Sequence, residues 1–296
     1  MSVTEKGRVS ARAVSGDRLP RRVGRAVLRP FRPVDEVSRA IAVGHRLQRS
    51  TATGRRIVVD DLGTGTDTAV VTALLARAFA HFRNDRVLAV DATGRTPSLA
   101  GRLDTVDAYL EAEVNGLDFG TAREGLAEAG SGLWTVAVRA DDTETARLTS
   151  LFRFFGLTLV AGTPGRLADA LGSTAHARVW AVRATREAAA RVGRALDGLT
   201  RRGRGDEARR TVVVLFDERR GEDPGFDAVR AAAILAESGA AVVRLAHDRH
   251  LAHARAVRTR RVAEATHRTV LQVAAEVLER SAEGGADPRR REGERA

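Results

Sequence analysis

Most of the chain alternates short hydrophobic runs with longer amphipathic stretches. The runs are rich in valine, leucine and alanine, and they are nearly continuous rather than interrupted at every second position. Their sequences are RRIVVD, DRVLAVD, LWTVAVR, LTLVAG, ARVWAV, TVVVLFD and AAVVRLA. Continuous hydrophobic strands are typical of parallel sheets whose two faces are both covered by helices. The pattern therefore predicts a buried, mostly parallel sheet.

The stretches between these runs have the length of the helices that connect parallel strands in right-handed crossovers. The main helical stretches are residues 67–82, 143–155, 186–200 and 226–238, and a last long helix is predicted at 262–278. Together these elements predict an α/β fold with a doubly wound, mostly parallel sheet flanked by helices.

Composition divides the chain into four parts. An arginine-rich stretch containing Pro20, Pro30 and Pro33 is predicted to be disordered, and a short helix with Asp35 and Glu36 in its first turn follows it. The predicted parts are a basic arm at 1–33, a lead-in helix and linker at 34–54, an α/β domain at 55–282 and a disordered tail at 283–296.

Positive charge is concentrated at the start of the chain. The formal net charge is +11, and residues 1–56 hold fourteen Lys/Arg against four Asp/Glu, which is +10. Such a segment attracts DNA or an anionic membrane without reading sequence. The alternative interpretation is a solvated tail that only maintains solubility.

Several classes of protein are disfavoured by what the sequence lacks. It contains no cysteine, which excludes disulfides and thiolate metal sites and permits a reducing compartment. We find no apolar run for a signal peptide and none long enough to be a transmembrane segment. A cytoplasmic protein is expected.

The first predicted strand leads into a Gly/Thr turn, GTGTDT at 63–68, and then a helix. Such turns offer free amides and a helix N-terminus to an anion at the carboxyl edge of a parallel sheet. A standard P-loop adds a lysine for the phosphates and a hydroxyl for Mg²⁺. Here Asp67 takes the lysine position, Thr68 keeps the hydroxyl, and the chain has one lysine in all, Lys6.

Asp67 weighs against a triphosphate in this turn. Two unit charges about 4 Å apart interact by about 4 kcal/mol at an effective dielectric of 20. No arginine lies between Arg56 and Arg77, so we expect a compensating cation to come from a partner subunit or from the basic arm. The alternative is a simple turn, in which the negative charge of Asp67 is stabilised because it lies near a helix N-terminus.

Other chemical interpretations are weaker. Gly63, Gly65 and Thr68 partly match a dinucleotide fingerprint, with Asp91 as a ribose acceptor. Three imidazoles and a carboxylate within seven residues suggest a metal site at His247, Asp248, His250 and His253. Surrounding arginines oppose a cation there, and a solvated loop is the alternative.

Two further patterns favour structural roles. No G-x-S-x-G elbow is present, which disfavours an acyl-transfer enzyme. The adjacent pair Asp60 and Asp61 is expected to cap a turn, because neighbouring side chains of a strand point apart.

Two long segments resemble the MinD/ParA family of deviant Walker-A ATPases. The first is GRRIVVDDLGTGTDTAVVTALLARAFAHFRNDRVLAVDATGRTPSLAGRL, and the second is SGAAVVRLAHDRHLAHARAVRTRRVAEATHRTVLQVAAEVLE. The resemblance extends from about residue 55 to residue 280. It implies a P-loop NTPase fold, in which the loop at Gly63, Thr64, Gly65, Thr66, Asp67 and Thr68 holds phosphate.

The chain departs from the family at several positions. Against the family's KGGVGKTT, residues 62–69 keep only Gly63 and Thr68, and both lysines are absent. Asp91 matches the position that helps to activate water, although a helix cap is the alternative role. The Walker B strand ends at Ala161 and Gly162 without an aspartate. The family's adenine-reading asparagine is replaced by Phe216 or Asp217.

The resemblance implies roles in intracellular positioning, partitioning or secretion, usually as dimers. Our main hypothesis is a degenerate member, a pseudo-ATPase that acts as a non-hydrolysing partner or scaffold, as a homodimer or with an active paralogue. No cofactor is expected in that case. If the site is functional, ATP and Mg²⁺ bind, with Thr68 on the metal and Asp91 catalytic. A third hypothesis is nonspecific DNA or membrane contact through residues 1–56.

Overall fold

A computed structural model describes residues 16, 34–49, 51, 54–110, 118–138, 142–163, 171–172, 174–253 and 255–283. The predicted arm, apart from Gly16, and nearly all of the predicted tail lie outside the described residues. The lead-in helix is present as α2, Val34–Leu47.

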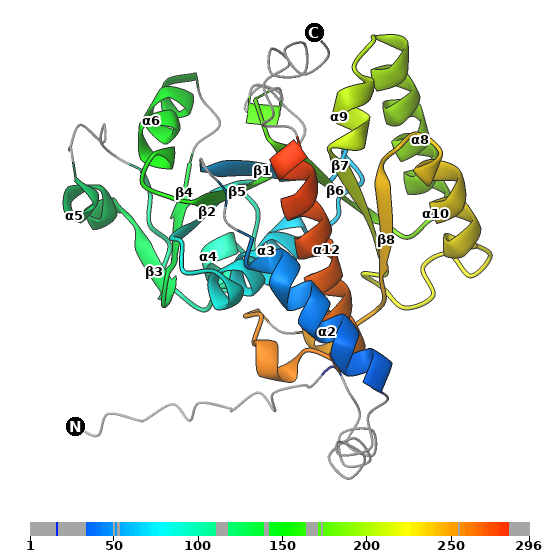
Figure 1. Cartoon of the computed structure of the whole chain (residues 1–296), viewed down its shortest axis with the longest axis horizontal. Helices are drawn as coiled ribbons and strands as arrows, with labels where there is room; N and C mark the ends of the chain where they lie inside the picture. Colours follow the sequence, from blue (N-terminus) through cyan, green and yellow to red (C-terminus); the bar gives the residue numbers. More distant parts are fainter. Residues whose placement is uncertain are drawn as a thin grey trace, which may run out of the picture.

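An eight-stranded sheet forms the centre of the protein (Figure 1). Its spatial order is β3-β4-β2-β5-β1-β6-β7-β8. The strands are β1 Arg55–Asp60, β2 Val87–Ala92, β3 Ala127–Gly130, β4 Leu133–Ala137, β5 Leu157–Gly162, β6 Ala177–Arg183, β7 Thr211–Phe216 and β8 Ala241–Leu245. Every neighbouring pair is parallel except β3 with β4.

The predicted α/β fold with a mostly parallel sheet is confirmed. All seven hydrophobic runs form strands, but the sequence did not predict β3. Its four residues, AEAG, are short and partly exposed, so they carry no hydrophobic signal. An antiparallel strand at the edge of the sheet needs only one buried face.

Helices cover both faces of the sheet, as Figure 1 shows. On one face α2, α3 and α12 pack together over the central strands. On the other face lie α6 at one end of the sheet, and α8 and α10 at the other. The long helices are α3 Thr68–Phe82, α6 Asp142–Phe152, α8 Arg186–Arg201, α10 Ala228–Ala236 and α12 Glu264–Glu283.

Short helices complete the loops. They are α4 Leu99–Arg102, α5 Phe119–Ala122, α9 Gly205–Arg209 and α11 Arg249–His253, with single 3-10 turns η2 Arg123–Gly125 and η3 Thr259–Arg261. The last helix starts later than predicted, because Val262 caps η3 in an extended conformation. Among the described residues, no helix is long and apolar enough to cross a membrane.

The position of β1 determines where the candidate site lies. This strand runs in the middle of the sheet between β5 and β6. Ile57 and Val59 face the α3 and α12 layer, whereas Val58 faces the α6 layer. Since both faces are fully packed, the carboxyl end of β1 is rigidly held, and the loop that follows it opens at the edge of the sheet.

Candidate functional site

The loop between β1 and α3 turns through unusual backbone conformations. Leu62, Gly63 and Gly65 have φ values of 50°, 74° and 74°. Glycine adopts this left-handed region without strain, but a residue with a side chain rarely does. Leu62 is therefore held there by the contacts of the loop.

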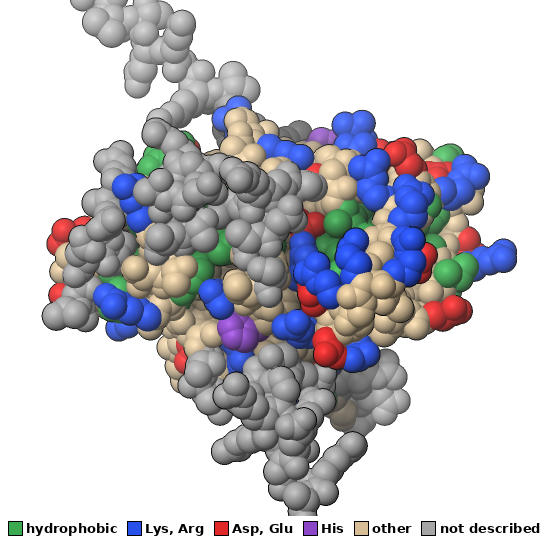
Figure 2. All heavy atoms as spheres, turned by 90° about the horizontal axis from the view of Figure 1, so that it is seen from above, with side chains coloured by type: hydrophobic (Ala, Val, Ile, Leu, Met, Phe, Trp, Pro, Cys, Tyr) green, Lys and Arg blue, Asp and Glu red, His purple; other side chains and the backbone are tan. Residues whose placement is uncertain are grey.

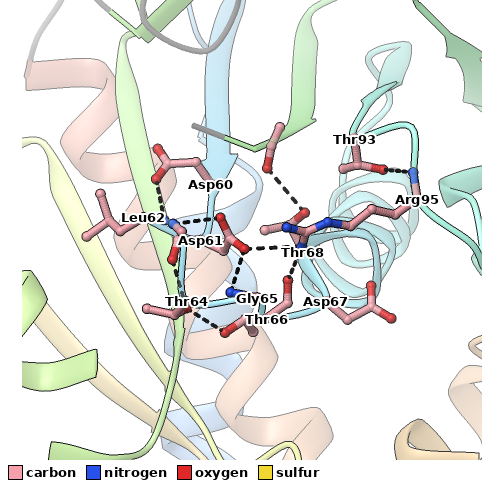
Figure 3. Close-up of polar contacts among 12 residues, drawn as sticks. Asp60, Asp61, Leu62, Thr64, Gly65, Thr66, Asp67, Thr68, Thr93 and Arg95 are labelled. Atoms are coloured by element: carbon pink, nitrogen blue, oxygen red, sulfur yellow. Dashed lines mark hydrogen bonds and ion pairs between the residues drawn. The ribbon is translucent and has the colours of Figure 1, made fainter. Parts of the chain in front are cut away.

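The Asp61 carboxylate lies inside this loop (Figure 3). The side chain is fully buried, with 0% of the residue exposed. Its Oδ1 accepts the Gly63 amide at 3.0 Å and its Oδ2 accepts the Gly65 amide at 2.9 Å. The predicted turn-capping role of Asp61 is thus observed, and the amides that it caps belong to the Gly/Thr turn itself.

An arginine from the loop after β2 closes the same turn. Nη1 of Arg95 donates to Oδ2 of Asp61 at 3.1 Å and to the Thr66 carbonyl at 3.0 Å. We expected a compensating cation to come from a partner subunit or the basic arm, whereas Arg95 and Arg102 bring positive charge to the carboxylates of the loop from within the chain. Parallel strands bring the loops after β1 and β2 to the same edge, although Asp61 and Arg95 are 34 positions apart.

Two further arginines hold the outer side of the loop. Nη1 of Arg191 donates to the carbonyl oxygens of Leu62 at 3.3 Å and Gly63 at 2.9 Å. Nη2 of Arg183 lies 3.4 Å from the Gly65 carbonyl oxygen, and Nη1 pairs with Glu222 at 3.0 Å. Arginines thus satisfy the loop carbonyls, while Asp61 satisfies two of its amides.

Asp67 caps the helix that follows the loop. Its Oδ1 accepts the Val70 amide at 3.0 Å, and its Oδ2 pairs with Nη2 of Arg102. This is the contact that the simple-turn interpretation predicts. The helix N-terminus favours the negative charge of Asp67, and Arg102 from α4 neutralises it.

Asp60 lies on the opposite side of the strand from Asp61. Its Oδ1 accepts the Leu62 amide at 3.2 Å, and its Oδ2 pairs with Arg178 at 3.1 Å. Burial raises the pKa of Asp60, and Arg178 opposes this shift. The two adjacent carboxylates point apart, as the sequence predicts.

Asp91 and Thr68 each have hydrogen-bond partners within the protein. Asp91 accepts the Thr93 amide at 2.9 Å, the Thr93 hydroxyl at 2.7 Å and the Leu99 amide at 2.6 Å. The Thr68 hydroxyl donates to the Gly162 carbonyl at 3.4 Å. Asp91 thus has the contacts of a cap, which is the alternative role considered for it.

A cavity of about 410 Å³ lies beside Asp67. Its lining combines apolar side chains such as Phe216 and Leu251 with charged ones such as Glu218 and Arg219. Burial raises the pKa of Glu218, and the charge of Asp67 adds to this effect. Its Asp67 and Arg102 side chains are already paired with each other.

The histidine-rich segment has structural contacts. Asp248 accepts the amides of His250 and Ala263, both at 2.7 Å, and Nε2 of His250 accepts the Arg258 amide at 3.0 Å. Within the described part of the chain, no three His, Asp or Glu side chains gather in a way that suits a metal ion.

Positive charge also gathers at the opposite end of the sheet. Figure 2 looks onto the end where α9 lies, which is where β7 begins, and shows Arg side chains, with acidic ones among them, on the side of α8 and α9. Nearby, burial lowers the pKa of His176 to about 4, and the charges of Arg55, Arg56 and Arg210 add to this effect. Nδ1 of His176 accepts the Arg56 amide at 3.1 Å.

The sequence did not predict the roles that two residues, Asp61 and Arg95, have in the site. Asp61 looked like an ordinary turn residue, because nothing in its local pattern indicates a buried acceptor for two amides. Arg95 carries no signal at all in a chain with 49 Lys/Arg residues. Only the topology, which places the β1 and β2 loops together, identifies the pair.

No protein-family model matches the chain, and no curated protein sequence matches it. Solved structures do match. A ParA family ATPase from Chlorobium tepidum TLS is 14% identical with a TM-score of 0.52, covering 78% of this chain and 98% of that one. The MinC:MinD cell division protein complex from Aquifex aeolicus is 16% identical with a TM-score of 0.54, and the match covers 79% of this chain and 98% of that one.

The septum site-determining protein MinD complexed with Mg-ADP from Pyrococcus horikoshii OT3 is 12% identical with a TM-score of 0.50, covering 77% of this chain and 95% of that one. At such identities the likeness concerns the fold alone. The chain has a P-loop NTPase fold of the ParA/MinD type. The resemblance read from the sequence is confirmed at this level.

Proposed function

We propose that this protein is a ParA/MinD-type fold with a degenerate nucleotide site, which acts as a non-hydrolysing partner or scaffold in intracellular positioning, partitioning or secretion. The fold supports the family-level role, and the chemistry of the loop after β1 supports the loss of hydrolysis. We infer a cytoplasmic protein that forms a homodimer or pairs with an active paralogue.

The observation that carries the proposal is the charge in and around this loop. Asp60, Asp61 and Asp67 lie within eight residues, and the chain has no lysine there. The arginines that contact the loop are engaged with these carboxylates or with loop carbonyls. A triphosphate would meet repulsion of about 4 kcal/mol for each close like-charge pair.

The residues at the Mg²⁺ position support the same conclusion. Mg²⁺ prefers oxygen ligands that include one or two carboxylates, but β5 ends at Ala161 and Gly162. The Thr68 hydroxyl, the remaining candidate ligand, lies within hydrogen-bond distance of the Gly162 carbonyl. The residues present therefore do not fit a magnesium nucleotide.

A weak ATPase is the alternative function. It is favoured by Arg95 and Arg102, which bring cations to the loop from within the chain. In that case Thr68 would hold Mg²⁺ and Asp91 would orient water. Nucleic-acid binding through residues 1–56 is a further alternative, and most of that segment lies outside the described residues.

Isothermal titration of the full chain with ATP and Mg²⁺ tests the proposal. We expect no binding tighter than the millimolar range, about −4 kcal/mol, and no phosphate release. Submicromolar binding, about −8 kcal/mol, would favour the weak ATPase. Repeating the titration with residues 1–50 removed shows whether the arm contributes any binding that is seen.

A further inference from the structure

We propose that Asp61 is a built-in anion: its carboxylate occupies the position of a phosphate group in the loop, and removing it opens a latent site for a phosphate-type oxyanion. The proposal rests on the proposed function, because it supplies a physical reason why the loop does not take up a nucleotide. It predicts a binding property that the wild-type protein lacks.

The donors around Asp61 are those that an oxyanion requires. Two backbone amides, from Gly63 and Gly65, converge on the carboxylate at 3.0 and 2.9 Å, and the Arg95 guanidinium completes the set at 3.1 Å. Backbone amides in a left-handed turn, together with an arginine, are common donors to phosphate. Figure 3 shows the contacts of Gly65 and Arg95 with the Asp61 side chain.

A local turn does not account for these contacts. An Asx turn needs one hydrogen bond to the amide two residues ahead, which Gly63 provides. Asp61 also accepts from the residue four ahead and from an arginine 34 residues away, and it is fully buried. A buried carboxylate is costly unless charged donors surround it. The site is therefore organised around a negative charge.

The remaining contacts should preserve the loop when Asp61 is removed. Arg191 still binds the carbonyls of Leu62 and Gly63, and Arg95 still binds the Thr66 carbonyl. Asp67 still caps the N-terminus of α3. The two freed amides and Arg95 would then face the space that the carboxylate leaves.

The test is Asp61→Gly, which removes the side chain from the loop and leaves the arginines. We titrate inorganic phosphate and follow binding by calorimetry and by the melting temperature, since a ligand that binds only the folded state raises it. Wild-type protein should show no phosphate-dependent shift. The variant should bind phosphate at least about tenfold more tightly, a difference of about 1.4 kcal/mol.

Asp223→Gly is the matched control. Asp223 also accepts a backbone amide and pairs with an arginine, in this case Arg186, but it lies outside the loop. This control should gain no phosphate binding, although its charge changes equally. The double variant Asp61→Gly with Arg95→Ala should lose the gain, and Asp61→Asn should show little, because its side chain still fills the space.

Each outcome decides the proposal. If Asp61→Gly binds phosphate no better than wild type or Asp223→Gly, Asp61 is only a turn residue and the proposal is wrong. If Asp61→Gly folds poorly, Asp61→Ser is prepared as well. Addition of about 10 mM phosphate should then restore the circular dichroism spectrum of the folded protein in both variants. Failure of both to recover overturns the proposal. Tight ATP binding by wild type, in contrast, would contradict the proposed function. It would not affect the comparison of phosphate binding between Asp61→Gly and Asp223→Gly.

Discussion

Asp61 and Asp91 stand at the ends of strands on either side of β5, yet their surroundings differ. Asp61 is fully buried, reaches over its own loop and pairs with Arg95. Asp91 is 5% exposed, and its hydrogen bonds in the described structure come from neutral donors nearby in sequence, Thr93 and Leu99. One carboxylate takes the place of a ligand, and the other caps a turn.

The difference shows why a motif position alone does not define a site. Asp91 matches a catalytic position of the family, but its contacts are those of a structural residue. Asp61 stands at a position where a P-loop has glycine, and its contacts resemble those of a bound anion. Contacts across the sheet edge, rather than the motif, separate the two.

The largest effect is expected for Asp61→Ala. The change leaves two amides without their acceptor and Arg95 without its carboxylate partner, and each buried donor left unsatisfied costs about 1 to 3 kcal/mol of the free energy of unfolding. Urea denaturation followed by circular dichroism measures it. A loss below about 1 kcal/mol would mean that the pair behaves as an exposed ion pair, and the contrast with Asp91 would fail.

A smaller effect is expected for Asp91→Ala. This side chain accepts three hydrogen bonds from neutral donors, and loss of such a cap costs about 1 to 2 kcal/mol. The same denaturation experiment checks it. If Asp91→Ala lowers the free energy of unfolding more than Asp61→Ala does, the two carboxylates have been assigned the wrong roles.

The smallest effect concerns pH at the opposite end of the sheet, where His176 is half-buried among arginines. Its pKa is lowered from 6.5 to about 4, so the unfolded chain binds the proton more readily. Stability from this group is fully present above pH 6.5 and is lost as the pH falls toward 4. The size is on the order of 1 kcal/mol after allowance for solvent screening.

His176→Gln tests this effect. The difference in unfolding free energy between wild type and variant should change between pH 6.5 and 4 and stay constant above pH 6.5. Using the difference cancels the contributions of Asp60 and Glu218, whose pKa values are raised and which act in the opposite direction. A constant difference across the whole range would show that burial and the neighbouring arginines do not lower the pKa of His176.

The fold was predictable because its signal is long and repeated. Strands such as β1 and β7 are hydrophobic throughout, and the segments between strands have the length of crossover helices. The site was less predictable because it depends on contacts distant in sequence. Arg95 and Arg102 reach Asp61 and Asp67 only because parallel strands align their loops. The short edge strand β3 lacked a hydrophobic pattern and was missed.

The central claim is that the loop after β1 already contains its anion. A crystal structure of the full chain grown with ATP and Mg²⁺ tests it most directly. We predict that the Asp61 carboxylate remains on the amides of Gly63 and Gly65, paired with Arg95, with no phosphate in the loop. A phosphate group bound to those amides, with Asp61 turned out of the loop, would contradict the account.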